Sequence, residues 1–199
     1  MRMIESPASD CLMRCVFTLD HQAMDSTPVQ GIPMNTASNA PAIPLKEFDA
    51  EMATTRAMLE RVPDGHDKYK PHEKSMEFGY LALLTSSIPG WIHDTLRKNE
   101  IDLGAQDPPS SAPARQLLEA FDGMVKGARQ ALQEITGDKL AEDWSLKHGE
   151  HVLMTLPRGE AVRQHLNHLI HHRGQLSVYE RLLDVKLPAI YGPSADTKW

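Results

Sequence analysis

The sequence predicts an all-α protein, specifically an antiparallel four-helix bundle with a long connection between its second and third helices. Four segments repeat apolar residues three or four positions apart, which is the spacing of one face of an α-helix. Mostly polar connections separate these segments, so we expect each helix to pack its apolar face against the others. The predicted helices cover about residues 45–62, 75 onward, 114–135 and 161–183.

The first helix carries one apolar stripe. The stripe consists of Leu45, Phe48, Met52, Thr55, Leu59 and Val62. Proline is favoured in the first turn of a helix and cannot continue one. Pro44 and Pro63 therefore predict where this helix begins and where it ends.

The second helix is predicted to begin near Ser75, because serine caps helix N-termini well. Its apolar face comprises Leu81, Leu84, Ile88 and Trp91. Pro89-Gly90 should kink or break the helix, since proline lacks a backbone N–H. Residues 102–113 contain three prolines and two serines, which predicts a long loop and allows a crossover to the third helix.

The third and fourth helices flank a segment without clear periodicity. Thr136-Gly137-Asp138 is expected to end the third helix. Residues 140–158 look irregular and are expected to hold a short strand or a turn. The fourth helix keeps the apolar spacing through Val162, His165, Leu169, His172, Leu176, Tyr179 and Leu183. Two of these core-facing positions are histidines.

Residues 1–43 are predicted to be a poorly ordered tail, and residues 44–199 to be the helical domain. Residues 22–44 are rich in Pro, Ser, Thr, Asn and Ala, which bury too little apolar surface to offset the entropy of ordering. Met34 is an alternative start, because the domain-like sequence follows it. Cys11 and Cys15 are expected to be free thiols in this tail, since two thiols cannot complete a structural zinc site.

Composition excludes several classes of function. The formal net charge is −6 and the basic residues are dispersed, so no basic field attracts nucleic acid. No apolar run approaches the roughly 18 residues of a membrane helix. Glu5 and Asp10 interrupt any signal-peptide pattern. We therefore expect a cytoplasmic protein that acts on a small molecule, without nucleic-acid or membrane partners.

His168 and His172 are the candidate metal ligands. Their four-residue spacing on a helix puts both imidazoles on one face, about one turn apart. Neutral imidazole is a good ligand for a divalent ion such as zinc, nickel or iron(II). The alternative is that both are interior histidines, hydrogen-bonded to each other, to water or to tyrosine side chains.

Both histidines lie in the run Asn-His-Leu-Ile-His-His-Arg-Gly-Gln-Leu at residues 167–176, which resembles the fourth-helix motif of the DinB-like family. The resemblance continues, in the family's order, at residues 48–56, 69–76, 88–91 and 190–196. It implies a four-helix bundle, often a homodimer, in which three histidines hold a divalent metal and two of them come from the fourth helix. For members of known activity it implies a transferase or isomerase that uses a low-molecular-weight thiol such as bacillithiol or mycothiol.

The chain departs from the family's pattern at Leu84. The spacing from Met76 and from residues 89–91 places the family's second-helix histidine at this position, and leucine cannot bind a metal. Two protein ligands with solvent hold an ion more weakly than three. The alternatives for a third ligand are His165, His93, Tyr80 and Ser87.

Two functions are therefore left open by the sequence. One is a metal-dependent transferase or isomerase with an incomplete histidine triad. The other is a non-catalytic helical binding or dimerisation module that has lost its metal site.

The sequence also predicts the surroundings of three residues beside the histidines. His171 should be exposed, because it points away from His168. Arg173 is expected to form a salt bridge or an interface contact, with a substrate anion as the alternative partner. Gly174 costs about 1 kcal/mol relative to alanine in mid-helix, which suggests close packing at a helix crossing or a dimer seam.

Overall fold

The computed structural model describes residues 43–105 and 113–198. Nearly all of the predicted tail, including Cys11, Cys15 and Met34, lies outside the described residues. Ile43 is the one tail residue described, and its side chain is buried in the core.

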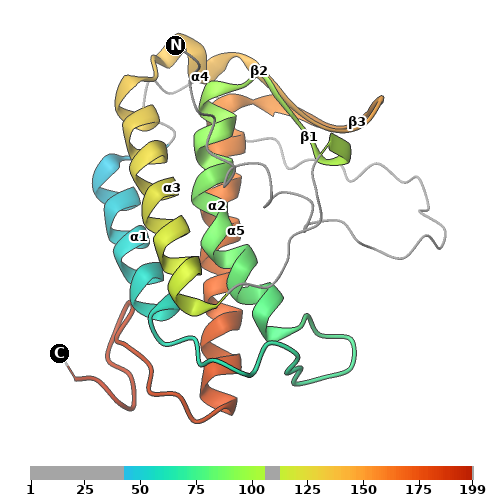
Figure 1. The fold of residues 1–199 in the computed structure, drawn as a ribbon. Coiled ribbons are helices and arrows are strands. Elements are labelled where there is room, and N and C mark those ends of the chain that lie inside the picture. The colour runs from blue at the N-terminus through green and yellow to red at the C-terminus, as the bar shows by residue number, and fades with distance from the viewer. Residues whose placement is uncertain (1–42, 106–112, 199) are drawn as a thin grey trace, which may run out of the picture.

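The prediction of a mainly helical protein is confirmed. Four long helices lie side by side (Figure 1): α1 packs against α3 and α5, and α2 packs against the same two helices. A 3₁₀ turn and a short helix, α4, lie between the long ones. The helices are α1 (Leu45–Leu59), α2 (Phe78–Arg97), the 3₁₀ turn (Leu103–Ala105), α3 (Ala114–Glu134), α4 (Gly137–Ala141) and α5 (Arg158–Leu182). Among the described helices, none combines the length and the apolar character that crossing a bilayer requires.

Several helix ends differ from the predicted ones. Helix α1 ends at Leu59, before Pro63, and α5 begins at Arg158, directly after Pro157. Helix α2 begins at Phe78, because residues 69–75 form hydrogen-bonded turns in place of a helical turn capped by Ser75.

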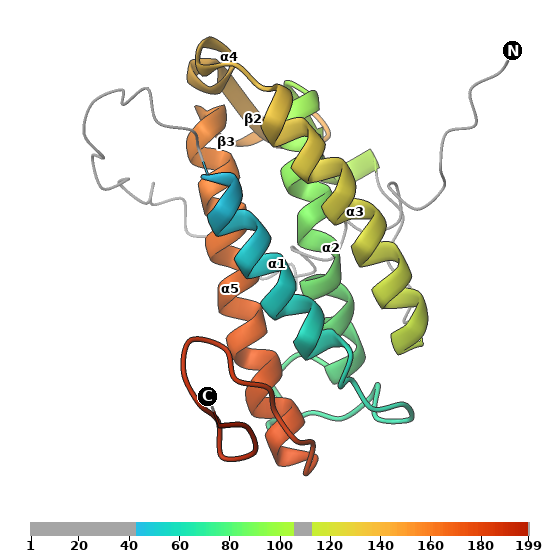
Figure 2. The same cartoon turned by 90° about the vertical axis from the view of Figure 1, so that its left-hand side faces the viewer.

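Two of the long helices, α1 and α5, run in one direction, and the other two, α2 and α3, run in the opposite direction (Figures 1 and 2). Asp49 pairs with Arg129 and Arg56 pairs with Asp122, so α1 and α3 are antiparallel. Both views show α2 and α3 running in the same direction, opposite to α1 and α5 (Figures 1 and 2). The chain must therefore return along the bundle between α2 and α3, which explains the long connection predicted there.

Pro89-Gly90 was predicted to kink or break α2, and the break is wrong because the helix continues through Pro89. Burial outweighs the lost backbone hydrogen bond, because Ile88, Pro89 and Trp91 are all enclosed by the bundle. Gly90 instead permits close helix packing: a Cβ atom at this position would lie 2.7 Å from Sδ of Met124 on α3.

A three-stranded sheet at one end of the bundle corrects the all-α prediction. The strands are β1 (Glu100–Asp102), β2 (Asp143–His148) and β3 (His151–Pro157), in the order β1-β2-β3. Strand β1 pairs parallel with β2, and β2 pairs antiparallel with β3. Gly149 turns the hairpin in the left-handed region, with φ of 59°. The buried Trp144 ring fixes β2 against the helices.

Arg158 joins the sheet end of the bundle to the helices. Its buried guanidinium donates from Nη1 to the backbone oxygens of Thr95 and Lys98, each at 2.5 Å, and from Nη2 to Oδ1 of Asn99 at 2.8 Å. The carbonyl groups in the last turn of a helix have no intrahelical partners. Arg158 therefore caps the C-terminus of α2 from the first turn of α5.

Glu180 is a fully buried acid in the last turn of α5. Neither carboxyl oxygen has a hydrogen-bond partner among the described residues, and burial raises the pKa of this carboxyl from 4.5 to about 8 despite the opposing charge of Arg61. The folded protein therefore keeps this proton at pH values where the unfolded chain releases it. Its stability should fall as the pH rises from 4.5 to about 8.

Replacing Glu180 with glutamine should remove this loss. A shift of this size corresponds to roughly 4 kcal/mol between the two ends of the range. We expect Glu180→Gln to match the wild type near pH 4.5 and to exceed its unfolding free energy at pH 8.5, as measured by urea denaturation. Equal pH dependence of the two proteins would contradict the assignment.

Candidate functional site

The predicted histidine pair faces inward from α5, and its two rings converge. Nε2 of His168 lies 2.6 Å from Nε2 of His172, and the ring centroids are 4.4 Å apart. The helical spacing of four residues produces this approach directly. His171, between them in sequence, is exposed as predicted.

Both imidazoles are neutral at neutral pH. Burial, followed by the charges of His172 and His171, lowers the pKa of His168 from 6.5 to about 4. Burial also lowers the pKa of His172, against the opposing effect of its hydrogen bond with Gln175. Only the neutral ring offers a lone pair to a metal ion, so burial keeps both side chains in a form able to bind one.

An aromatic side chain of α2 lies against one ring of the pair. The Trp91 ring centroid lies 5.5 Å from that of His168 and 5.9 Å from that of His165. Trp144 of β2 stands edge-on to His165 at 5.9 Å. Strand β2, which lies in the segment where a short strand or a turn was expected, thus contributes an aromatic side chain beside His165.

His165, the first alternative for a third ligand, is engaged elsewhere. Its Nε2 lies 3.1 Å from Oγ1 of Thr95, and burial lowers its pKa to about 3. It is therefore a neutral, partly buried histidine hydrogen-bonded to a hydroxyl group.

Two of the other proposed third ligands have partners of their own: His93 contacts Asp94 on α2, and the buried Ser87 hydroxyl donates to a backbone carbonyl. Tyr80 is half-buried, and Leu84, at the position of the family's third ligand, is 2% exposed within the core. Within residues 43–105 and 113–198, no three His, Cys, Asp or Glu side chains are grouped so that they could hold a metal ion.

The donor set supplies two positions of a metal site. Two ligands at about 2.1 Å from a tetrahedral ion lie about 3.4 Å apart. The observed 2.6 Å between the Nε2 atoms is a hydrogen-bonding distance, so the rings of His168 and His172 would have to separate slightly to admit an ion. The chemistry and direction of these two donors fit a divalent metal, and the remaining positions would fall to water or substrate.

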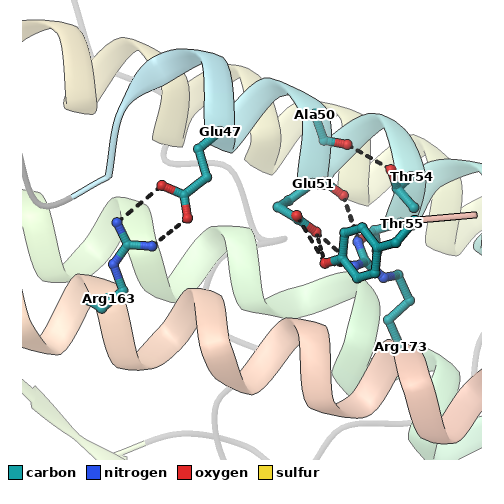
Figure 3. Close-up of polar contacts among 8 residues, drawn as sticks. Glu47, Ala50, Glu51, Thr54, Thr55, Arg163 and Arg173 are labelled. Atoms are coloured by element: carbon teal, nitrogen blue, oxygen red, sulfur yellow. Dashed lines mark hydrogen bonds and ion pairs between the residues drawn. The ribbon is translucent and has the colours of Figure 1, made fainter.

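Arg173 points away from the histidines and forms the predicted salt bridge. Its guanidinium is 1% exposed, and Nη2 lies 2.7 Å from Oε2 of Glu51 on α1 (Figure 3). Nη1 donates to the backbone oxygen of Glu51 and to Oγ1 of Thr55. Since its donors are occupied by α1, Arg173 fixes the rotation of α5 and with it the direction of the neighbouring His172.

Tyr191 closes this ion pair from the C-terminal segment. Its hydroxyl donates to the Glu51 carboxylate at 2.8 Å and accepts from Nη2 of Arg173 at 2.6 Å. The guanidinium carbon lies 5.3 Å from the centroid of the Tyr191 ring, within cation–π range. Glu51 and Tyr191 could not be recognised from the sequence as partners of Arg173, because they lie 122 and 18 positions away from it.

Gly174 does not mark a helix crossing within the chain. A Cβ atom at this position would meet no described atom within 4 Å, because the residue faces away from the other helices. A dimer seam stays a prediction.

Mainly helical proteins with paired histidines on a long helix are the class that this geometry defines. Within that class, the model of the DinB family matches residues 34–198. The chain belongs to the DinB family, as the run at residues 167–176 predicted.

Similar proteins extend this result. The uncharacterized protein YrdA of Bacillus subtilis (strain 168) is 24% identical over 152 residues, which is 76% of this chain and 88% of YrdA. The crystal structure of the DinB-like protein YjoA of Bacillus subtilis superposes with a TM-score of 0.56 at 19% identity, covering 72% of this chain and 94% of YjoA. A DinB-like protein from Bacillus cereus ATCC 10987 gives 0.55 at 22% identity, covering 74% and 95%. At these identities the solved structures share the fold alone.

Removing the guanidinium of Arg173 should destabilise the protein strongly. Arg173→Met leaves the Glu51 carboxylate unpaired in a nearly closed site, and we expect a loss of about 3–5 kcal/mol in unfolding free energy, measured by urea denaturation. Arg129→Met, which breaks the exposed pair of α1 with α3, is the matched control and should cost less than about 1 kcal/mol. Similar losses in both variants would contradict the role assigned to Arg173.

Proposed function

We propose that this DinB family protein is a metal-dependent enzyme of the thiol-using transferase or isomerase type, with an incomplete histidine triad. In this proposal His168 and His172 hold a divalent ion such as zinc, nickel or iron(II), and the chain works as a cytoplasmic homodimer on a small-molecule substrate. In this proposal the four long helices are the family's bundle, with α1 and α5 antiparallel to α2 and α3 and with the crossover between α2 and α3 (Figures 1 and 2).

The observation that carries the proposal is the convergence of two neutral imidazoles. Their Nε2 atoms point at each other within a site walled by Trp91, and burial keeps the rings of His168 and His172 uncharged. Protonated histidines would repel a cation, and splayed rings would bind one ion each at most. Neither applies to this pair.

The chain's own residues prepare the site in three ways. Arg173 anchors α5 to α1 and so orients the histidines, and Trp91 limits the access of water from the side of α2. Because no third His, Cys, Asp or Glu joins the pair among the described residues, coordination positions are left for substrate. A divalent ion bound there would lower the pKa of a thiol and hold it as the thiolate nucleophile.

Metal titration tests the proposal. We expect the wild type to bind one zinc or nickel ion by calorimetry, and a hundredfold excess over Kd should stabilise it by about 2.7 kcal/mol in thermal unfolding. His172→Ala should abolish binding, whereas His151→Ala at the exposed hairpin should not. A wild type that binds none of zinc, nickel and iron(II) would rule out this function.

A non-catalytic binding or dimerisation module is the second candidate. Leu84 favours such a module. The resemblance to the family implies a third metal ligand at this position, and a buried aliphatic side chain occupies it. A site that had lost this ligand would be left with two histidines in direct contact, as they are at 2.6 Å.

Restoring a ligand at position 84 distinguishes this candidate. If the protein is such a module, the wild type should bind no zinc and Leu84→His should create affinity, measured by calorimetry. Leu83→His, one residue away and pointing about 100° around the helix, is the control and should not bind. Circular dichroism must show that both variants stay helical, and tight zinc binding by the wild type would exclude the module.

A further inference from the structure

Gln175, His172 and His168 form a series of hydrogen-bonded side chains along α5. Its Oε1 lies 2.7 Å from Nδ1 of His172, whose Nε2 lies 2.6 Å from Nε2 of His168. Gln175 is half-buried and one helical turn after His172, so its amide reaches the far nitrogen of the ring that faces His168. Each of these two contacts requires one hydrogen between its two atoms.

The number of hydrogens available determines which atom donates in each of these two hydrogen bonds. An amide oxygen only accepts, so the hydrogen between Gln175 and His172 belongs to Nδ1 of the histidine. A neutral imidazole has a single N–H, which leaves Nε2 of His172 with a bare lone pair. The hydrogen between the two rings must then come from Nε2 of His168.

We infer that Gln175 is a positioning residue that holds His172 as the tautomer with its hydrogen on Nδ1. In that form the Nε2 lone pair of His172 is directed permanently toward the site. The inference concerns the ring itself, and it rests on the proposed function only where metal affinity is used as a readout.

The two histidines then have unequal parts in binding an ion. His172 needs no proton movement, because its Nε2 is already bare. His168 must give up the hydrogen on Nε2 and take one on Nδ1 from solvent, so no net proton is released. A hydrogen bond from the distal ring nitrogen typically changes metal affinity 10–100-fold, by setting the tautomer and orientation of the ligand.

Nitrogen-15 spectroscopy of the full chain tests this assignment without any metal. Long-range correlation between the ring nitrogens and protons distinguishes Nδ1–H from Nε2–H, and the His172 signals are identified by their loss in His172→Ala. We expect Nδ1–H in the wild type, and a shift to Nε2–H in Gln175→Leu. Gln175→Glu keeps an acceptor oxygen and should retain Nδ1–H. Zinc affinity should fall at least about tenfold in Gln175→Leu and not in Gln175→Glu.

A matched control and two contrary outcomes make the test decisive. Gln164→Leu, at an exposed position of the same helix, should change neither the tautomer nor the affinity. If Gln175→Leu fails to fold, Gln175→Met replaces it. Nε2–H on His172 in the wild type, or Nδ1–H that persists without Gln175, would overturn the inference. If the tautomers behave as expected but the wild type binds no zinc, the proposed function fails and the role of Gln175 stands.

Discussion

The buried ion pair between Arg173 and Glu51 is the constraint on which the candidate site depends. A buried charge is costly unless it is paired and hydrogen-bonded, so α5 can dock on α1 only in the rotation that satisfies this guanidinium. His172 precedes Arg173 in the chain and is directed about 100° around the helix from it. Fixing one side chain against α1 therefore directs the other toward Trp91 and α2.

The same rotation explains why the two imidazoles are neutral. Turned toward the interior, His168 and His172 lose the solvation that would stabilise a positive charge, which lowers the pKa of both, and the charge of His172 lowers the pKa of His168 further. A pair of neutral rings one turn apart is consistent with a metal site and with a structural hydrogen bond. The difference between a metal site and a structural hydrogen bond lies in which further groups contact the pair, and Gln175 is one polar side chain that does so.

Apolar spacing predicted the four long helices because each of them has one face turned to a common core. It did not predict the sheet, because β1 has only three residues and pairs with Ser145–Lys147, more than forty positions later in the chain. The break that was one of two outcomes predicted at Pro89 is absent for a related reason: a local rule about proline does not include the burial that keeps α2 continuous. The histidine pair was predictable because it lies within one helical turn. The partners of Arg173 were not, since Glu51 is 122 residues away.

The pairing of α1 with α5 also has a consequence for how the protein is made. The first long helix leaves the ribosome well before the last one, and the contact between Arg173 and the backbone of Glu51 spans 122 positions. Until α5 is synthesised, Glu51 has no cation from that helix and the α1 face that receives it stays open to solvent. Folding of the nascent chain is therefore completed late, when the final long helix closes the bundle, and the histidine pair is assembled only in that last step.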